Sequence, residues 1–464
     1  MQKQHLPQLV KGTRDIYAAQ AIHRNYIIDH IKAVYQSYGF MPLETPALEQ
    51  VSTLLGKYGT DGEQLIYRIL NSGDFLAAFP PVSADTNYKT LLPHIADKGL
   101  RYDLTVPLMR YIATHYHELI FPFKRYQIQP VWRADRPQKG RYREFYQCDV
   151  DVVGTPALWV EAELLAIVHE VLARVGIIAF KISLNNRAIL NSIVTQMGAA
   201  ERVNEFCIII DKLDKIGKDK VMQELISKGF DPEALAKFAF IFEIQGDNAA
   251  KLQLLRTSLQ DNESGLEAIA TTAELLTLLN KLGIPDTHIS IEPSLARGLA
   301  YYTGTIFEVT LPNVDIGSIV GGGRYTNFGE TFGLKNMTGV GMSFGLDRLH
   351  VAMESLGLLP DAHGLGTQVL FTHLGQEAAD IVLHAIPHLR HQGIAIELYP
   401  EAVSLKKQLS YANKKQVPFV VIIEEESLKT QKYTLRNMDK GTQNLHTAEE
   451  LITLFDGFKA HMPA

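Results

Sequence analysis

Hydrophobic residues recur at two different periods along this chain, and each period predicts a different element. Over residues 17–38 they are spaced mostly by threes and fours, which predicts an amphipathic helix that Gly39 ends. Over residues 141–152 polar and apolar residues alternate strictly, which predicts a strand whose successive side chains point to opposite faces. The apolar face of this strand can pack on a core, and it consists of Tyr146, Cys148, Val150 and Val152.

The polar face of the same strand is sorted by charge. Arginines stand at its start, an aromatic ring in its middle and acids at its far end. A ligand that is anionic at one end and donates hydrogen bonds at the other would fit this face, while a solvated charged hairpin is the common alternative. The basic loop before the strand, residues 135–140, is longer than the Asn-Gly or Asp-Gly turn of a simple hairpin. The face consists of Arg141, Arg143, Phe145, Gln147, Asp149 and Asp151.

The pattern changes again after about residue 186. A helical pattern with capping and turn residues fills residues 186–283, strands return at residues 289–291 and 305–309, and residues 357–366 are typical of a linker. Beyond it strands and helices alternate, which is typical of a small α/β domain with a largely parallel sheet, and Thr447 is the expected N-cap of the last helix. The strands are expected at residues 368–372, 394–398 and 419–423, and the helices at residues 377–392, 405–415 and 447–458.

Composition narrows the class of protein. The chain has 464 residues, 46% hydrophobic and 21% charged, which is typical of a soluble globular protein of two to four domains. A net charge of -6 argues against nonspecific coating of nucleic acid, but not against a local basic patch. Two cysteines are too few for a disulfide framework or a zinc ribbon, and the 16 histidines form no metal-like cluster, so no tightly bound metal is expected. The chain shows no apolar run long enough to cross a bilayer and no signal-peptide core, so we expect a cytosolic protein.

Two segments carry side chains suited to a binding site. In RYDLTVPLMRY, residues 101–111, Asp103 stands just before a predicted helix that Thr105 would cap. Asp103 either helps to cap that helix or accepts hydrogen bonds from a ligand ammonium. In RGLAYYTGTIFEV, residues 297–309, an arginine and two adjacent tyrosines precede a strand, and at least one tyrosine hydroxyl needs a polar partner if it is buried.

Two further segments are rich in glycine. GGGRY, residues 321–325, allows a backbone to approach a ligand closely, but most such runs are turns, and the phosphate-loop pattern is absent from the chain. GVGMSFGLDRL, residues 339–349, leads into a helix with Arg348 in its first turn. An arginine there opposes the helix dipole unless an anion or an acid lies nearby. Arg348 is therefore a candidate phosphate contact, and an ion pair with Asp347 or a neighbouring acid is the alternative.

Taken in order, these segments resemble the class II aminoacyl-tRNA synthetases, and among them the histidyl-tRNA synthetase family. The helix and extended segment that end at Pro46 resemble the first motif of the class. The hairpin with Arg133 resembles the second motif, and residues 339–349 resemble the third. RGLAYY and GGGRY are similar to segments particular to the histidine enzymes. SLKKQLSYANKKQVPFVVII, residues 404–423, is similar to their anticodon-binding domain.

The resemblance implies an α/β architecture of the α+β kind. An antiparallel-sheet catalytic core would be interrupted by a helical insertion and followed by a C-terminal α/β anticodon-binding domain, in a homodimer built on the first motif. The expected boundaries are residues 1–185 and 286–355 for the core, 186–285 for the insertion and 366–464 for the anticodon-binding domain.

The resemblance also implies the reaction and its residues. Histidine would be activated by ATP, with Mg²⁺, to histidyl-adenylate and then transferred to its tRNA in the cytoplasm, with Arg297 as the catalytic arginine. The histidine-binding residues would be Asp103, Leu104, Thr105, Arg133, Gln147, Asp151, Arg297, Tyr301 and Tyr302. The ATP-binding residues would be Arg133, Arg141, Phe145 and Arg348, and the tRNA contacts would include Arg136, Gln138 and Lys139.

Departures from the family pattern are few. Ala300 stands where relatives often carry an acid, and Asp103 and Asp151 stand where some use glutamates. Three alternatives compete with the ligase: a non-catalytic, synthetase-like histidine sensor or regulatory subunit, a class II synthetase for another amino acid, and a binding module without catalysis. The retention of Arg133, Arg297 and the C-terminal segment argues against the sensor.

Overall fold

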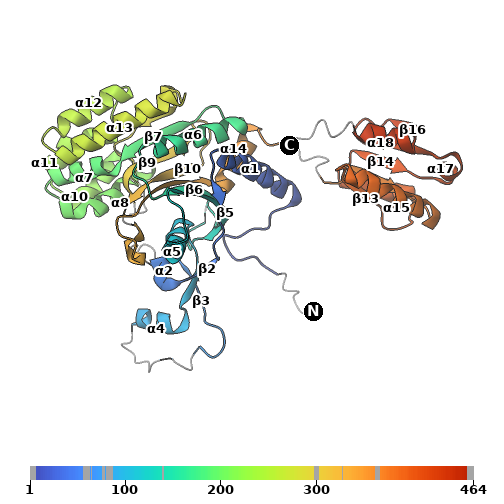
Figure 1. The fold of residues 1–464 in the computed structure, drawn as a ribbon, viewed down its shortest axis with the longest axis horizontal. Coiled ribbons are helices and arrows are strands. Elements are labelled where there is room, and N and C mark those ends of the chain that lie inside the picture. The colour runs from blue at the N-terminus through green and yellow to red at the C-terminus, as the bar shows by residue number, and fades with distance from the viewer. Residues whose placement is uncertain are drawn as a thin grey trace. The chain divides into compact units, whose positions relative to one another are not determined.

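The chain folds into two compact units (Figure 1). One unit comprises Met1–Ile16 and Arg24–Leu359, and the other comprises Tyr17–His23 and Pro360–Ala464. The computed structural model describes residues 7–55, 63, 65–75, 79, 87–137, 140–296, 302–326, 328–360 and 366–456.

An eight-stranded sheet forms the centre of the first unit, in the order β1-β5-β6-β11-β10-β9-β7-β8. Its neighbours pair antiparallel except for β1 with β5 and β7 with β8, so the predicted antiparallel core is confirmed. Strands from distant parts of the chain lie side by side, because β11 pairs with β6 and β9 pairs with β7. The strands are β1 (Met41–Pro42), β5 (Phe123–Trp132), β6 (Glu144–Val153), β7 (Lys181–Asn186), β8 (Ile289–Ile291), β9 (Tyr302–Thr310), β10 (Val320–Thr326) and β11 (Thr338–Gly345).

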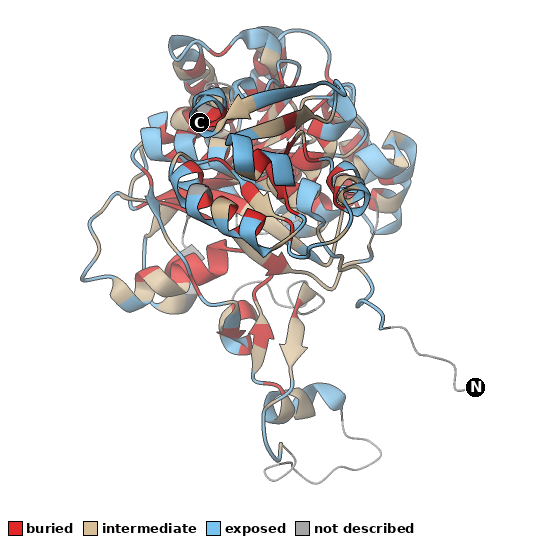
Figure 2. Cartoon of the chain, turned by 90° about the vertical axis from the view of Figure 1, so that its right-hand side faces the viewer, coloured by how far each residue is buried: buried red, intermediate tan, exposed pale blue. Residues whose placement is uncertain are grey.

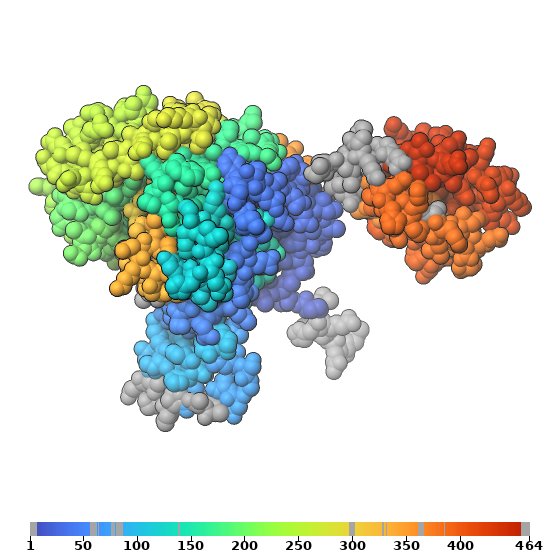
Figure 3. Space-filling model, in the orientation of Figure 1, coloured from blue at the N-terminus to red at the C-terminus, as the bar shows by residue number. Residues whose placement is uncertain are grey.

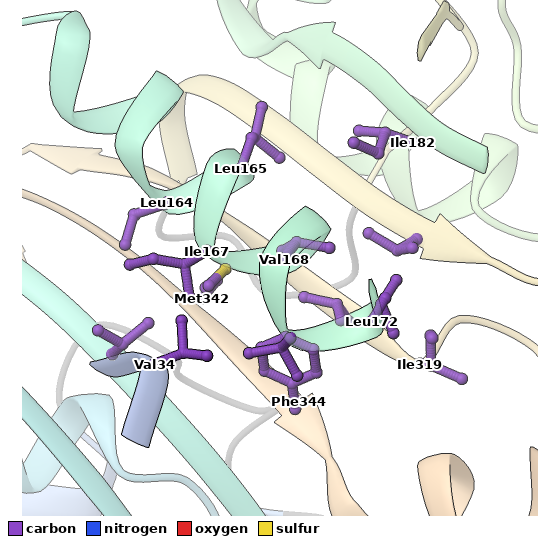
Figure 4. Close-up of a cluster of buried hydrophobic side chains, with 14 of the residues drawn as sticks. Val34, Leu164, Leu165, Ile167, Val168, Leu172, Ile182, Ile319, Met342 and Phe344 are labelled. Carbon is purple, nitrogen blue, oxygen red and sulfur yellow. The ribbon is translucent and has the colours of Figure 1, made fainter. Parts of the chain in front are cut away.

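Helices cover one face of this sheet and bury its main hydrophobic core. In Figure 4, Leu164, Ile167 and Val168 of α6 lie against Met342 and Phe344 of β11. Complete burial of such a side chain contributes roughly 1.5–3 kcal/mol. The predicted apolar face of β6 packs into the same core, which leaves its polar face turned to the other side of the sheet. The covering helices are α1 (Ala18–Ser37), which matches the predicted helix, α6 (Trp159–Arg174) and α14 (Leu346–Leu356).

One expectation for β6 was wrong at its start. The ladder between β5 and β6 ends where Trp132 pairs with Glu144, so Arg141 and Arg143 precede the strand. The backbone of Arg143 bonds on two sides, because its N–H donates to the carbonyl of Gly12 at 2.9 Å and its carbonyl accepts the Arg133 N–H at 2.9 Å.

The region between β7 and β8 is helical and packs around a second hydrophobic cluster. Asp231, Asp247 and Asn262 cap three of its helices by accepting hydrogen bonds from backbone N–H groups, at positions where the sequence carries capping residues. In the space-filling view this region, green to yellow, is one continuous mass (Figure 3). Its helices are α7 (Arg187–Gln196), α8 (Val203–Ile210), α9 (Leu213–Ile216), α10 (Lys218–Ser227), α11 (Pro232–Phe238), α12 (Asn248–Ser258) and α13 (Glu263–Lys281).

A three-stranded sheet and the short buried helix α5 (Thr105–His115) complete the first unit. Figure 2 colours the chain by burial, with the buried parts of its strands and helices in red and the exposed parts in pale blue. The expectation that Thr105 caps α5 was wrong, because the N-cap is Leu104 and Thr105 is already helical. The side chain of Asp103 makes the capping bond instead, accepting the Val106 N–H at 3.1 Å. The remaining elements are β2 (Leu48–Gln50), β3 (Tyr67–Ile69), β4 (Lys98–Leu100), α2 (Val51–Leu55) and α4 (Tyr88–Ile95).

The second unit has a five-stranded sheet in the order β13-β12-β14-β15-β16. β13, β12 and β14 are parallel, but β15 and β16 are antiparallel, so the sheet is mixed rather than largely parallel as predicted. The hairpin of β15 and β16 was missed because its residues are mostly polar and half-exposed or exposed. The predicted cap of α18 is confirmed, since the Glu450 N–H donates to Thr447 Oγ1 and the Thr447 N–H to Glu450 Oε2.

Where an element of this unit was predicted from the sequence, its observed bounds lie close to the predicted range. They are β12 (Val369–Thr372), β13 (Ile396–Leu398), β14 (Phe419–Ile422), β15 (Lys432–Asn437), β16 (Gln443–Thr447), α15 (Gln376–His391), α16 (Leu405–Lys414), α17 (Glu425–Thr430) and α18 (Ala448–Asp456). Among the helices that the structure describes, in either unit, none is long and apolar enough to cross a membrane.

Candidate active site

A cavity of about 410 Å³ opens on the polar face of β6, opposite the α6 side of the sheet. It brings together residues far apart in the sequence, from the loop before α5, from the segment between β5 and β6, from β6, β9, β10 and β11, and from the first turn of α14. The side chains that β6 contributes are Phe145, Gln147, Asp149 and Asp151, which are four members of the charge-sorted face.

Most of the residues predicted from the sequence line this one cavity. They are Asp103, Thr105, Arg133, Arg141, Phe145, Gln147, Asp151, Tyr302 and Arg348. Leu104 does not line it; the residue is buried, and its carbonyl accepts a hydrogen bond from Arg125 at 3.2 Å. Arg136 is exposed and lies outside the lining. Gln138, Lys139, Arg297, Ala300 and Tyr301 lie outside the described residues.

Three carboxylates form one end of the cavity, which we call the acid end. Asp103, Asp149 and Asp151 are only 2%, 3% and 2% exposed. Asp151 is held from two sides: an Arg125 Nη2 lies 2.8 Å from its Oδ2, and the Tyr325 hydroxyl donates to its Oδ1 at 2.8 Å. Its carboxylate lies over Gly341, where a Cβ atom would stand 2.5 Å from Asp151 Cγ. The acid end therefore depends on a glycine in β11 and a tyrosine in β10.

Burial dominates the electrostatics of the acid end. It raises the pKa of Asp103 from 3.8 to about 6 and that of Asp149 to about 7, and it raises the pKa of Asp151 as well. Arg125 opposes the change for all three acids by its positive charge. A cationic or N–H-donating ligand would stabilise the ionised carboxylates further, because desolvation disfavours their charge when no partner is present.

A buried polar network supports Arg125 from behind. The side chains of Arg125 and Gln127 are fully buried on β5, and an Arg125 N–H donates to Gln127 Oε1 at 3.4 Å. Gln127 donates in turn to Thr45 Oγ1 at 2.8 Å and to Gln129 Oε1 at 2.6 Å. Arg101, 1% exposed, donates to the Gln129 oxygen at 2.9 Å and to the Thr45 carbonyl at 2.5 Å. Such a network fixes the position of Arg125 because each buried polar group would lose a partner if it moved.

Arginines stand at the other end, which we call the arginine end. Arg133 donates to the carbonyl of Tyr102 at 2.9 Å, and its guanidinium lies 5.3 Å from the centre of the Phe145 ring. Arg141 pairs with Asp135 at 2.6 Å, and Arg348 donates to the carbonyl of Ser318 at 2.6 Å.

The alternative in which Asp347 pairs with Arg348 is not observed. Asp347 Oδ1 is instead paired with both Arg14 and Arg24, and its Oδ2 accepts the Tyr146 N–H at 3.2 Å. Arg348 lines the cavity together with Arg133 and Arg141.

The GGGRY segment has a structural role that sequence reasoning did not assign. Gly322 and Gly323 lie inside β10, where a Cβ atom would stand 2.5 Å from a neighbouring strand's carbonyl oxygen in each case. Arg324 forms an ion pair with Glu161, which is 1% exposed, whereas Tyr325 holds Asp151. The glycines thus serve close strand packing, and the tyrosine serves the cavity.

Sequence reasoning missed several residues of the acid end. Arg125 and Gln127 belong to β5, to which no site residue was assigned from the sequence, although polar residues alternate along the strand. Asp149 was placed on the correct face without a role, and Tyr325 and Gly341 were noted only within glycine-rich segments.

Comparison with known proteins agrees with this geometry. Residues 97–349 match the family model of histidyl-tRNA synthetase, and residues 368–457 match that of an anticodon-binding domain. The histidine–tRNA ligase of Cytophaga hutchinsonii is 47% identical over 446 residues, which cover 96% of this chain and 98% of that protein. The histidine–tRNA ligase of Porphyromonas gingivalis is 48% identical over 446 residues, which cover 96% of this chain and 97% of that protein.

Solved structures give the same result. The crystal structure of histidyl-tRNA synthetase from Nostoc sp. PCC 7120 has a TM-score of 0.80 and 32% identity, and the match covers 98% of this chain and 99% of that one. A structure from Bacillus halodurans C, described as an ATP phosphoribosyltransferase regulatory subunit/histidyl-tRNA synthetase, shares the fold at 20% identity with a TM-score of 0.70. With its matched sequence, its antiparallel core and the ordered motifs around one cavity, the chain belongs to the histidyl-tRNA synthetase family.

Proposed function

We propose that this chain activates L-histidine with ATP and then transfers the histidyl group to the 3′ end of its tRNA. One observation carries the proposal: a single cavity has arginines at one end and three buried carboxylates at the other. An aminoacyl-adenylate has the matching polarity, because its phosphate is anionic and its amino acid carries an ammonium and an imidazole N–H.

The first step needs positioning and charge neutralisation more than a nucleophilic side chain. The carboxylate of histidine attacks the α-phosphorus of ATP, and pyrophosphate leaves. Arg133 would hold the carboxylate and the α-phosphate, while Arg141 and Arg348 would hold the outer phosphates, since a guanidinium binds two oxygens at once and stays protonated. Phe145 would stack on the adenine. Arg297 is proposed as the catalytic arginine that stabilises the charge developing on the α-phosphate.

Magnesium fits this end of the cavity as the companion of ATP. Two acids that line the cavity, Asp135, which is paired with Arg141, and Glu308, would share a magnesium ion with the phosphates. The ion would neutralise phosphate charge, and it usually binds through one or two carboxylates together with phosphate oxygens.

The acid end would select the amino acid. Asp103, Thr105 and Gln147 are proposed to surround the ammonium, with Leu104 shaping the same loop. Asp151 and a hydroxyl of Tyr301 or Tyr302 are proposed to read the imidazole ring. A site built to pair buried polar groups with both ring nitrogens rejects apolar isosteres, because they would leave those groups without partners.

The second substrate and the assembly complete the proposal. Arg136, Gln138 and Lys139 would contact phosphates of the tRNA acceptor stem, and residues 366–464 would bind its anticodon. Residues 1–185 and 286–355 would form the catalytic core and residues 186–285 its insertion. A cytoplasmic homodimer, dimerising through the segment that ends at Pro46, is the proposed working form.

ATP–pyrophosphate exchange with each amino acid in turn tests the function. Exchange that depends on histidine alone is the expected result. Histidine binding without exchange would identify a sensor, and exchange with another amino acid would identify a different synthetase. Asp151→Ala should abolish most histidine-dependent exchange while ATP still binds, and an equal loss of both would contradict the assigned site.

A further inference from the structure

The N-terminal segment, residues 10–14, lies against the loop that leads into β6. The carbonyl of Gly12 accepts the Arg143 backbone N–H at 2.9 Å, and the carbonyl of Lys11 accepts a guanidinium N–H of Arg143 at 3.1 Å. The segment also forms a turn, in which the Thr13 N–H donates to the carbonyl of Val10 at 3.0 Å. Two parts of the chain that are 132 residues apart are thus joined through backbone and side chain.

This contact requires a glycine at position 12. The φ angle of Gly12 is +91°, which lies in the left-handed region that favours glycine. A Cβ atom would also stand 2.7 Å from Arg143 Cδ and 2.9 Å from Pro137 Cγ. The segment can therefore approach the loop this closely only because no side chain stands between them.

Arg14 extends the contact to α14. Its guanidinium forms an ion pair with Asp347, in the first turn of that helix, and lies 3.7 Å from the centre of the Tyr142 ring in the loop. Arg24 of α1 pairs with the same carboxylate oxygen, and the other oxygen accepts the Tyr146 N–H at 3.2 Å. Asp347 is only 4% exposed. The N-terminal segment, α1 and β6 therefore meet at one buried carboxylate.

The two residues that Arg14 contacts both line the cavity, whereas Arg14 itself is not part of the lining. Tyr142 follows Arg141 in the loop, and Asp347 precedes Arg348 in α14. These two arginines are proposed to hold the outer phosphates of ATP, although they come from different elements. Two-point binding of a phosphate depends on where each guanidinium stands, and a misplacement of about 1 Å is costly.

We infer that Arg14 is a positioning residue for ATP. Through Tyr142 and Asp347 it holds the loop before β6 and the start of α14 in one arrangement, and so places Arg141 and Arg348 for the phosphates. The N-terminal segment thus acts on ATP without touching it. This inference rests on the proposed function of the cavity, because it takes the arginine end as the phosphate site.

A charge effect is the alternative to positioning. Arg14 and Arg24 share the single carboxylate of Asp347, so the group keeps a net positive charge beside Arg348. If this charge alone assisted ATP, removal of the Asp347 charge would strengthen the binding of ATP, because more positive charge would remain. Positioning requires the opposite result, because the tie between the N-terminal segment and α14 is lost.

The test measures ATP–pyrophosphate exchange on the full-length chain, with KM determined separately for ATP and for histidine. Arg14→Ala should raise KM for ATP about 3- to 30-fold, which lies within the range of coupling between contacting residues, and leave KM for histidine at the wild-type value. Arg14→Lys keeps the charge that pairs with Asp347 and should recover part of the loss. Asp347→Asn keeps an acceptor for the Tyr146 N–H but not the charge, and it should also raise KM for ATP.

Arg202→Ala is the matched control. The Arg202 side chain is 31% exposed, against 28% for Arg14, and it likewise pairs with an acid, Glu205. Its guanidinium also lies over an aromatic ring, 4.1 Å from the centre of Phe230. Because these contacts lie in the helical region between β7 and β8, Arg202→Ala should leave both KM values at the wild-type level.

Gly12→Ala tests the same segment without changing any charge. It should raise KM for ATP and leave KM for histidine unchanged, because the added Cβ pushes the segment away from the loop. Gly198→Ala controls for backbone strain, since Gly198 has a φ of +74° and its Cβ would meet no described atom within 4 Å.

The outcomes separate the inference from the proposed function. An unchanged KM for ATP in Arg14→Ala and Gly12→Ala, or equal increases in KM for ATP and for histidine, would overturn the role of Arg14 while leaving the ligase intact. A lower KM for ATP in Asp347→Asn would overturn positioning in favour of charge. A wild-type chain that does not exchange pyrophosphate with histidine would overturn the proposed function itself.

Discussion

Gly341→Ala is the most direct perturbation of the acid end, since the substitution adds a single carbon under Asp151. The new Cβ would stand 2.5 Å from Asp151 Cγ, whereas ordinary contact begins at 3.4 Å, so the carboxylate must move by about 1 Å. Tyr325 and Arg125 hold that carboxylate at 2.8 Å on two sides, so a shift of this size breaks at least one of these contacts.

The magnitude follows from two costs. Overpacking a buried site costs about 1–3 kcal/mol, and a lost hydrogen bond to a charged group costs about 1.5–3 kcal/mol. We therefore expect the free energy of unfolding to fall by roughly 3–5 kcal/mol. Activity should fall more than a hundredfold in kcat/KM for histidine, since each 1.4 kcal/mol is about tenfold.

Urea unfolding and pyrophosphate exchange measure the two effects. Gly345→Ala, at the end of the same strand, is the stability control, because its Cβ would meet no atom closer than 3.7 Å. In the background of Asp151→Ala, the cost of Gly341→Ala should shrink, since the clashing carboxylate is gone. Unchanged stability and an unchanged KM for histidine in Gly341→Ala would refute the placement of Asp151 over this glycine.

Three further predictions concern the same unit. Tyr325→Phe removes the hydroxyl that donates to Asp151, so KM for histidine should rise about 10- to 100-fold with KM for ATP unchanged, and parallel changes in both would contradict a local role. Arg324→Met should lower the free energy of unfolding by about 3–5 kcal/mol, because Glu161 is left as an unpaired buried charge, and Arg324→Met with Glu161→Gln should recover part of it in urea unfolding. The pKa of Asp149 is raised by burial from 3.8 to about 7, so the folded chain binds a proton that the unfolded chain releases. Its contribution to stability is therefore full below about pH 4 and lost as the pH rises through about 7. The unliganded chain should lose stability between about pH 5 and pH 8, and histidine should raise the melting temperature more at pH 8 than at pH 5; thermal scans that show the opposite trend would refute this sign.

Local pattern was sufficient to locate much of the secondary structure. The period of hydrophobic residues placed the first helix, and strict alternation placed the two faces of β6, because a buried face imposes its period on the sequence. Thr447 was identified as a cap from its position alone, since capping is an interaction between residues three apart. Where the pattern was polar, as in the hairpin of β15 and β16, the strands were not found.

The candidate site was predicted only where its residues belong to recognisable segments. Asp103 illustrates the limit: the sequence offered a capping role or a ligand role, and the structure shows one oxygen capping the helix and the other buried without a hydrogen-bond partner among the described residues. Arg141 illustrates another limit of sequence reasoning. Its ion pair with Asp135, six residues earlier in the loop, was not anticipated.

The sequence alone therefore determined the elements, the charge-sorted face of β6 and the family, because each is encoded by neighbouring residues or by motifs read in order. Tertiary structure alone decided which side chains meet at the acid end. Tyr325 reaches Asp151 across 174 residues, and Gly341 and Arg125 flank that acid from the neighbouring strands β11 and β5. Those contacts follow from the pairing and register of strands across the sheet, which no local pattern in the chain specifies.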